Sequence, residues 1–222
     1  MASLQEHVGR RADEDAGELA SRILPRVRER SRLLKLQLQL ADEETGALDT
    51  GALDRFVHFD AAVLPSSHYV ELIEDRPNSV RLVTGTMVEA LGWNTHELSE
   101  QALTNLAPHD RDAVEGFVQS DPGIYVSNFA DGNDMGRLLL PWLFRQLDVA
   151  GRPVVFPLSC DVVLVTGEDE PERIKALAVN LLKRLDELSH EGIVEPWVLG
   201  DDDTWQVLEL SEDHPAYPRV GD

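Results

Sequence analysis

The clearest candidate for metal chemistry is the run at residues 131–136, whose sequence DGNDMG resembles the start of a calcium-binding loop. Such a loop needs oxygen ligands at its fifth and twelfth positions as well as at earlier ones. Counting from Asp131, those two positions are Met135 and Trp142, which supply no carboxylate. The run is instead typical of a turn from a strand into a helix, with Asp134 as the helix N-cap. Two aspartates also disfavour a small anion at this turn. Because the oxygen ligands at the fifth and twelfth positions are missing, we predict no metal there either.

Acid–base chemistry would require carboxylates that converge only in the fold. Asp131 and Asp161 are the candidates, and a pocket that held both would suit a hydrolase or a transferase. Catalytic-triad residue types also occur at residues 66–68 (SSH) and 159–161 (SCD), but neither run has the Gly-x-Ser-x-Gly elbow. The histidines form no i, i+4 metal pair, and no Walker or Rossmann motif occurs. We therefore predict no cofactor and keep the enzyme as an alternative.

The single cysteine, Cys160, excludes an internal disulfide and a zinc site built from several cysteines. A nucleophilic thiol needs a neighbouring base that lowers its pKa, and no histidine lies near Cys160 in the sequence. We expect a half-buried structural thiol that carries no activity.

The acidic turn, Asp201-Asp202-Asp203, lies between Trp197 and Trp205 in a predicted terminal hairpin. Two interpretations are open. The tryptophans can pack across the hairpin while the aspartates are solvated, or an aromatic anchor beside carboxylates can receive a basic peptide. The second interpretation makes these five residues a candidate binding face.

The overall charge favours a basic partner over a nucleic acid. The chain has 41 acidic and 20 basic residues, a formal net charge of −21, and such a surface repels phosphate backbones. A generally solvated acidic surface, as in a salt-adapted or GC-rich source, explains the same charge without any partner.

The length of 222 residues suits one domain. We predict a disordered leader at residues 1–14, a single α+β domain at 15–210 and a loose tail at 211–222. No run approaches the roughly 18 apolar residues of a membrane span, and the N-terminus has no apolar signal core, so we expect a cytoplasmic protein.

The hydrophobic pattern predicts a two-layer α+β domain, with a mostly antiparallel sheet and helices packed on one face, because several adjacent strands are joined by short turns. The clearest helix begins at Pro171 and has apolar residues at helical spacing as far as Leu188. Capping boxes at Thr86 and Asn94 predict two further helix starts. Another helix is expected from about residue 16, interrupted at Pro25. The remaining expected elements are strands at 34–40, 68–74, 79–84, 124–130, 154–156, 162–165 and 204–210, a helix with a core Trp142 at 138–147, and a helical turn at 110–118.

In order, these elements resemble a bacterial family known as domain of unknown function 1444. The likeness is carried by residues 23–28 (ILPRVR), 79–83 (SVRLV), 102–106 (ALTNL) and 157–167, where an aspartate, Asp161, leads into an apolar strand. Cys160 stands where the family tends to have a basic residue, and the spacing from Pro157 is one residue longer. The resemblance covers roughly residues 20 to 210 and implies a mixed α and β domain, but no activity. We therefore expect an uncharacterised bacterial protein, a non-enzymatic interaction module with an acidic surface.

Overall fold

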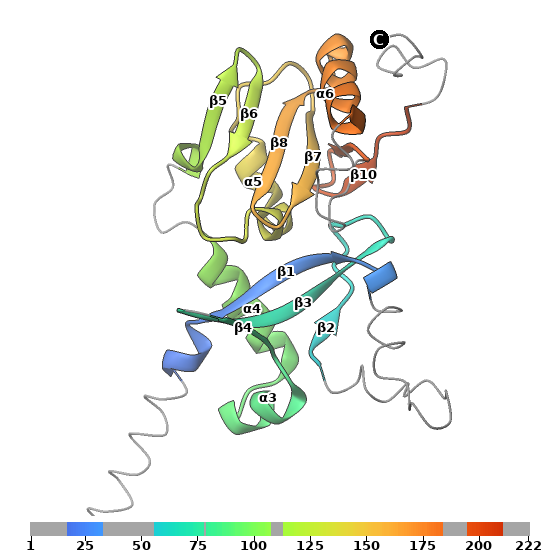
Figure 1. Cartoon of the computed structure of the whole chain (residues 1–222). Helices are drawn as coiled ribbons and strands as arrows, with labels where there is room; N and C mark the ends of the chain where they lie inside the picture. Colours follow the sequence, from blue (N-terminus) through green and yellow to red (C-terminus); the bar gives the residue numbers. More distant parts are fainter. Residues whose placement is uncertain (1–16, 33–55, 78, 108–112, 184–194, 211–222) are drawn as a thin grey trace, which may run out of the picture. The chain divides into compact units, whose positions relative to one another are not determined.

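The computed structural model describes residues 17–32, 56–77, 79–107, 113–183 and 195–210. The chain forms two compact units, unit 1 with Met1–Asp60 and Ser67–Ala107, and unit 2 with Ala61–Ser66 and Pro108–Asp222 (Figure 1). Because two units can belong to one domain, a single domain at 15–210 stays a prediction. The predicted leader, tail and strand at 34–40 lie outside the described residues.

Unit 1 contains an antiparallel sheet in which β3 pairs with every other strand. The helices α3 and α4 pack together against one face of this sheet, where Leu72 of β3 lies among their apolar side chains. The elements are β1 (Ile23–Glu29), β2 (His58–Phe59), β3 (His68–Arg76), β4 (Ser79–Leu82), α3 (Gly85–Leu91) and α4 (Thr95–Leu106).

The helix predicted from residue 16 is wrong beyond its first turn. Residues 17–20 are helical, but Ile23–Glu29 is strand β1, in register with β3. Pro25 has no N–H to donate and clashes with the preceding turn of a helix, whereas an edge strand tolerates it. The alternation of buried and less buried residues along β1 is the period of a strand.

The starts of the two helices of unit 1 follow from their caps. The Asn94 side chain accepts from the Glu97 N–H at 3.0 Å, and Glu97 accepts from the Asn94 N–H at 2.9 Å, so the predicted capping box is confirmed. The cap of α3 is Thr84 rather than the predicted Thr86, and Gly92 ends this helix in the left-handed conformation at φ 68°. The Asn105 side chain donates to the carbonyl of Ala20 and to that of Ile23, the first residue of β1, at 2.8 Å each. These two bonds tie α4 to the sheet.

One buried histidine of unit 1 makes stability depend on pH. Burial lowers the pKa of His68 from 6.5 to about 4; the positive charge of Arg30 adds to this, and Glu29 opposes it. The unfolded chain therefore binds a proton between pH 6.5 and 4 that the folded chain does not. We expect the free energy of unfolding to fall by up to about 3 kcal/mol as the pH drops through this window.

The measurement is urea unfolding at pH 7 and pH 4.5 for the wild type and for His68→Gln. The difference between the two proteins isolates this group from the carboxylates that titrate nearby. If both proteins lose the same stability between the two pH values, His68 does not cause the dependence.

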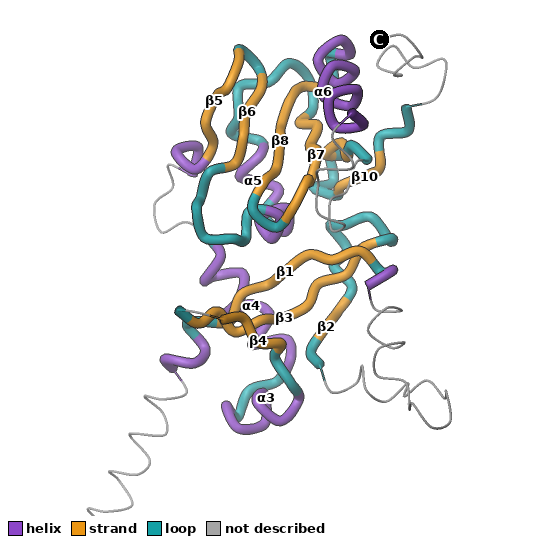
Figure 2. Tube along the Cα trace, in the orientation of Figure 1, coloured by secondary structure: helices purple, strands orange, loops and turns teal. Residues whose placement is uncertain are grey.

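Unit 2 contains the larger sheet, also antiparallel, with the strand order β10-β9-β7-β8-β6-β5 (Figure 2). Gly167 fits the sheet where a Cβ atom would lie 2.1 Å from the Ala150 carbonyl oxygen. The strands are β5 (Phe117–Asp121), β6 (Ile124–Ser127), β7 (Pro153–Ser159), β8 (Val162–Gly167), β9 (Trp197–Leu199) and β10 (Trp205–Val207).

Helix α6 (Pro171–Lys183) covers one face of this sheet through Ile174, Ala178 and Leu181, as its spacing predicted. The opposite face carries Trp205, whose ring contacts Phe144 of α5 (Pro141–Phe144) at 5.1 Å. Because helical segments lie on both faces of this sheet, unit 2 has three layers, whereas the prediction had two layers with helices on one face.

The predicted helix at 138–147 is wrong in its continuity. The structure has a 3-10 turn, η3 (Met135–Leu139), followed by the short helix α5. Pro141 causes the break, because it pushes Leu140 out of the helical region, to φ −120° and ψ 68°. Of the predicted helical turn at 110–118, residues 110–112 lie outside the described residues, Ala113–Gly116 is the 3-10 turn η2, and Phe117 already begins β5.

The predicted class, α+β with antiparallel sheets, is confirmed. The predicted strands belong to two sheets rather than one. Among the described residues, no helix has the length and apolar character that crossing a membrane requires.

Candidate functional site

The acidic turn lies where the sequence placed it, at the tip of the β9–β10 hairpin. Its three aspartates are exposed, and the turn closes through a bond from the Gly200 N–H to the Thr204 carbonyl at 2.8 Å. Asp203 adopts a left-handed conformation, φ 62°, which aspartate tolerates better than most residues do.

Arginines of unit 2 neutralise part of this charge. Arg145 donates from Nε to Asp203 at 2.6 Å and from Nη2 to the Gly200 carbonyl, also at 2.6 Å. Arg152 is held by two bonds to Glu168, which together with the nearby charge of Asp201 raise the pKa of its guanidinium. The acidic turn is therefore bonded to its own unit, and the nearby arginines offset part of its negative charge.

The aromatic half of the predicted binding face is wrong. Trp197 is 0% exposed and Trp205 is 2% exposed, so neither ring can receive a partner. Trp205 donates from its indole to the Leu138 carbonyl at 2.8 Å, and these two tryptophans belong to the core. Trp142, which the sequence placed in the core, is instead 42% exposed.

The loop at residues 131–136 and Arg137 form an ion cluster in unit 2, in which Asp134 and Arg137 are buried and Asp131 is partly exposed. Arg137 is buried, and it donates to both carboxylate oxygens of Asp131, at 2.9 and 2.6 Å, and to Asp134 at 3.4 Å. Its guanidinium carbon lies 3.7 Å from the centre of the Phe129 ring. The predicted N-cap bond of Asp134 is absent, because its carboxylate accepts from the Ser127 hydroxyl at 2.9 Å instead.

The protonation of the two aspartates follows from these contacts. Burial alone would raise the pKa of Asp131, but the hydrogen bonds and the charge of Arg137 outweigh it and hold that pKa below its usual range. Burial dominates at Asp134 and raises its pKa, although Ser127 and Arg137 oppose the shift. Arg137 therefore stabilises the charged form of Asp131, which partial burial would otherwise disfavour.

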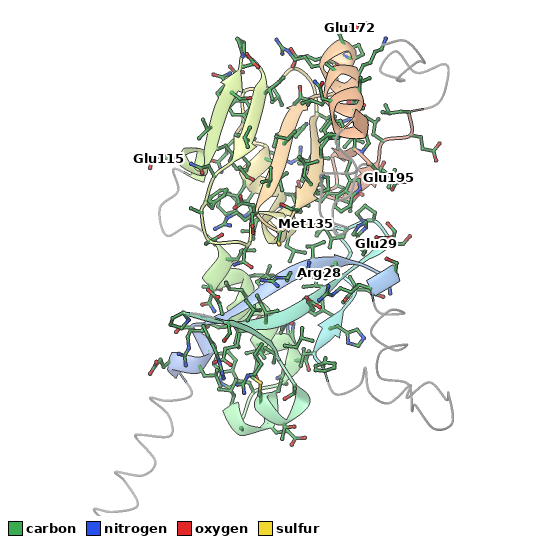
Figure 3. All side chains as sticks on the ribbon, in the orientation of Figure 1. Arg28, Glu29, Glu115, Met135, Glu172 and Glu195 are labelled. Carbon is green, nitrogen blue, oxygen red and sulfur yellow. The ribbon has the colours of Figure 1, made fainter. Side chains whose placement is uncertain are left out.

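The fold does bring the loops of Asp131 and Asp161 together. The Met135 N–H donates to the Cys160 carbonyl at 3.1 Å, and a Cβ on Gly132 would lie 3.3 Å from Asp161 Oδ1 (Figure 3, Met135 labelled). Asp131, however, is committed to Arg137 and is a poor base in this state. No group of three or more metal-ligating side chains occurs in the part of the chain that the structure describes. The hydrolase or transferase alternative stays a prediction.

A site that the sequence did not reveal lies on unit 1. A groove of about 520 Å³, which we call the Trp93 groove, runs beside α4, and its size lies within the range of ligand sites. Trp93 is half-buried at its wall, and Glu97 and Glu100 are exposed. The lining residues are Gly92, Trp93, Glu97, Glu100, Gln101 and Thr104.

Among the described residues, no lysine or arginine pairs with the glutamates of the Trp93 groove. Residues 85–107 contain three glutamates, one histidine and no lysine or arginine. Within the described part of the chain, the one ion pair of this stretch is between His96 and Glu100, at 3.5 Å, and it exists only when the histidine is protonated. The missing basic residues were visible in the sequence, but the hollow beside Trp93 was not.

No protein family, no curated protein and no solved structure matches this chain. The resemblance to domain of unknown function 1444 therefore stays a prediction, and the geometry of the two units has to carry any functional argument.

Proposed function

We propose that the protein is a non-enzymatic interaction module that binds a basic segment of another protein in the Trp93 groove. One observation carries this proposal: the groove joins an indole to two carboxylates on a stretch of chain without lysine or arginine. The net charge of −21 adds a long-range attraction for a basic partner.

The chemistry of the groove favours arginine as the anchoring residue of the partner. A guanidinium can stack on the accessible part of Trp93 while it donates to Glu97 or Glu100. Gln101 and Thr104 offer neutral polar groups along the same wall. The carboxylates provide orientation and rapid encounter, and the ring provides contact area.

The Trp93 groove is a better candidate than the acidic turn for a physical reason. The aspartates of the turn already have arginines close by, and its tryptophans are buried. A basic partner would have to compete with Arg145 for Asp203, and it would meet the positive charge of Arg152 near Asp201. At the groove it would meet carboxylates without a basic side chain in the adjoining helices.

The same charge argument disfavours nucleic acid as a partner, since a phosphate backbone would be repelled. We further propose a cytoplasmic setting in a bacterium and no membrane partner, in keeping with the family resemblance and the absence of a long apolar run.

The test is the affinity of a nine-residue arginine peptide for the full chain and two variants, measured by calorimetry at several salt concentrations. Glu97→Gln with Glu100→Gln should weaken binding by about tenfold and flatten the salt dependence, because two attracting charges are lost. Glutamine at position 97 can still serve in the capping box, so the helix start is kept. Trp93→Ala should weaken binding by roughly 3- to 30-fold, the range of a cation–π contact.

The matched control is Asp201→Asn with Asp202→Asn, which also removes two exposed charges. This variant should bind within about twofold of the wild type at 0.15 M salt, where the Debye length is about 8 Å. If the control loses as much affinity as the glutamate variant, the peptide responds to net charge and the groove is not the site.

A further inference from the structure

The outer strand of the sheet of unit 2 has an open edge. β5 is the last strand in the order of that sheet, and among the described residues it pairs only with β6. In Figures 1 and 2 the turn η2 lies at the start of β5, and no other described segment of unit 2 lies along the outer edge of this strand. An open edge is a template for a further strand.

The hydrogen-bond pattern shows which backbone groups face outward. The Asn128 N–H donates to the Gly116 carbonyl at 2.8 Å, next to the pair Phe117 and Ser127. That pair is therefore a non-hydrogen-bonded one, and the next pair, Val118 and Val126, exchanges the ladder bonds. The C=O of Phe117 and the N–H and C=O of Gln119 consequently point to the open edge, while the Phe117 N–H closes the 3-10 turn η2.

The side chains of β5 define what an added strand should carry. Val118 is 49% exposed and ends a row that runs across the sheet through Val126, Leu164 and Phe156. The last of these belongs to the core beneath α6. An apolar residue next to Val118 would extend this row by one strand.

The charges beside β5 select a basic segment rather than a second copy of this chain. Glu115 lies in η2, two residues before β5, and Asp121 is the last residue of the strand. Both are exposed, and residues 113–127 contain no lysine or arginine. Figure 3 shows Glu115 pointing away from the ribbon. Arg173 lies against the Gly123 turn, but it is paired with Glu170. Two copies, each of charge −21, would bring like charges together.

We infer that β5 accepts an extended segment of a partner protein, with alternating apolar and basic residues, as an added strand. Backbone bonds to Phe117 and Gln119 give the affinity, and side chains beside Val118, Glu115 and Asp121 give the preference. This edge belongs to unit 2 and does not depend on the Trp93 groove of unit 1.

The probe is a capped octapeptide of four Arg-Val repeats, added to the full chain and followed by amide hydrogen exchange. Binding at the edge should slow the exchange of the Gln119 amide by about tenfold, because this amide gains a partner. The Val118 amide, already bonded to β6, should change little. The same peptide with alternate backbone nitrogens methylated should give no protection.

Val118→Lys should weaken the protected binding by about tenfold or more, because it places a positive charge beside the basic strand. Val80→Lys is the matched control, because Val80 is 47% exposed on β4 of unit 1. The affinity of this variant for the peptide should stay within about twofold of that of the wild type. Trp93→Ala should leave the protection of the Gln119 amide unchanged, which separates this site from the groove. The inference is overturned if saturating peptide leaves the Gln119 amide unprotected, or if the two lysine variants bind alike.

Discussion

Replacing Arg137 with methionine should lower the free energy of unfolding of unit 2 by about 3–5 kcal/mol. The substitution leaves Asp134, which is 2% exposed, with the Ser127 hydroxyl and without a compensating charge. Asp131 loses both of its bonds to the guanidinium. The loss is measured by hydrogen exchange of the β8 amides, which reports unit 2 by itself.

The penalty of Arg137→Met should shrink as the pH falls, because Asp134, whose pKa is already raised, can then be protonated and neutral. Arg145→Met is the matched control. It breaks an ion pair to Asp203 in which the side chains are 37% and 60% exposed, so we expect a loss of about 1 kcal/mol or less. A loss for Arg137→Met no larger than for Arg145→Met would show that the cluster does not stabilise the fold.

Replacing Trp205 with alanine should destabilise unit 2 by a similar amount, about 3–5 kcal/mol. The ring fills the space next to Phe144, with the ring centres 5.1 Å apart. The indole N–H of Trp205 donates to the Leu138 carbonyl, and the backbone N–H of Trp205 donates to the Val63 carbonyl at 2.7 Å. Only the side-chain contacts are lost in the variant, and the carbonyl of Leu138 is left without that donor.

Trp142→Ala is the control for this prediction, because the same large ring is removed from an exposed position of the same unit. Its effect on the free energy of unfolding should stay within about 0.5 kcal/mol. Both variants are compared by urea unfolding. Equal effects of the two substitutions would contradict the assignment of Trp205 to the core and would return it to the candidates for surface recognition.

The class of the fold could be predicted because local patterns and tertiary packing agree along most of the chain. The apolar spacing after Pro171 is that of a helix, and the same residues, Ile174, Ala178 and Leu181, pack against the sheet. The capping box at Asn94 predicts where helix α4 begins. These signals are local, so the sequence contains them in full.

Predictions of individual helices and strands were wrong where two local signals compete. Charged residues around Pro25 favoured a helix by composition, yet the missing N–H of proline and the alternation of the segment favour a strand. Pro141 likewise divides a run whose apolar content predicts one helix. In both cases the backbone restriction at a proline prevails over the propensity of its neighbours.

The candidate site was only partly predictable. The exposure of the acidic turn follows from its sequence, but the burial of Trp197 and the bond of Arg145 to Asp203 depend on contacts between segments far apart. The Trp93 groove arises from the placement of the turn after α3 against α4, for which no residue pattern exists. The sequence showed only that residues 85–107 lack basic side chains.

The most direct test of the central claim is an amide correlation spectrum of the isotope-labelled full chain, titrated with the nine-residue arginine peptide at 0.15 M salt. We predict that the largest shifts fall on the Trp93 indole N–H and on the amides of Glu97, Glu100 and Gln101. The amides of the acidic turn should move much less. Shifts concentrated on Gly200 to Asp203, or spread evenly over the acidic surface with the Trp93 indole unmoved, would contradict the proposed function.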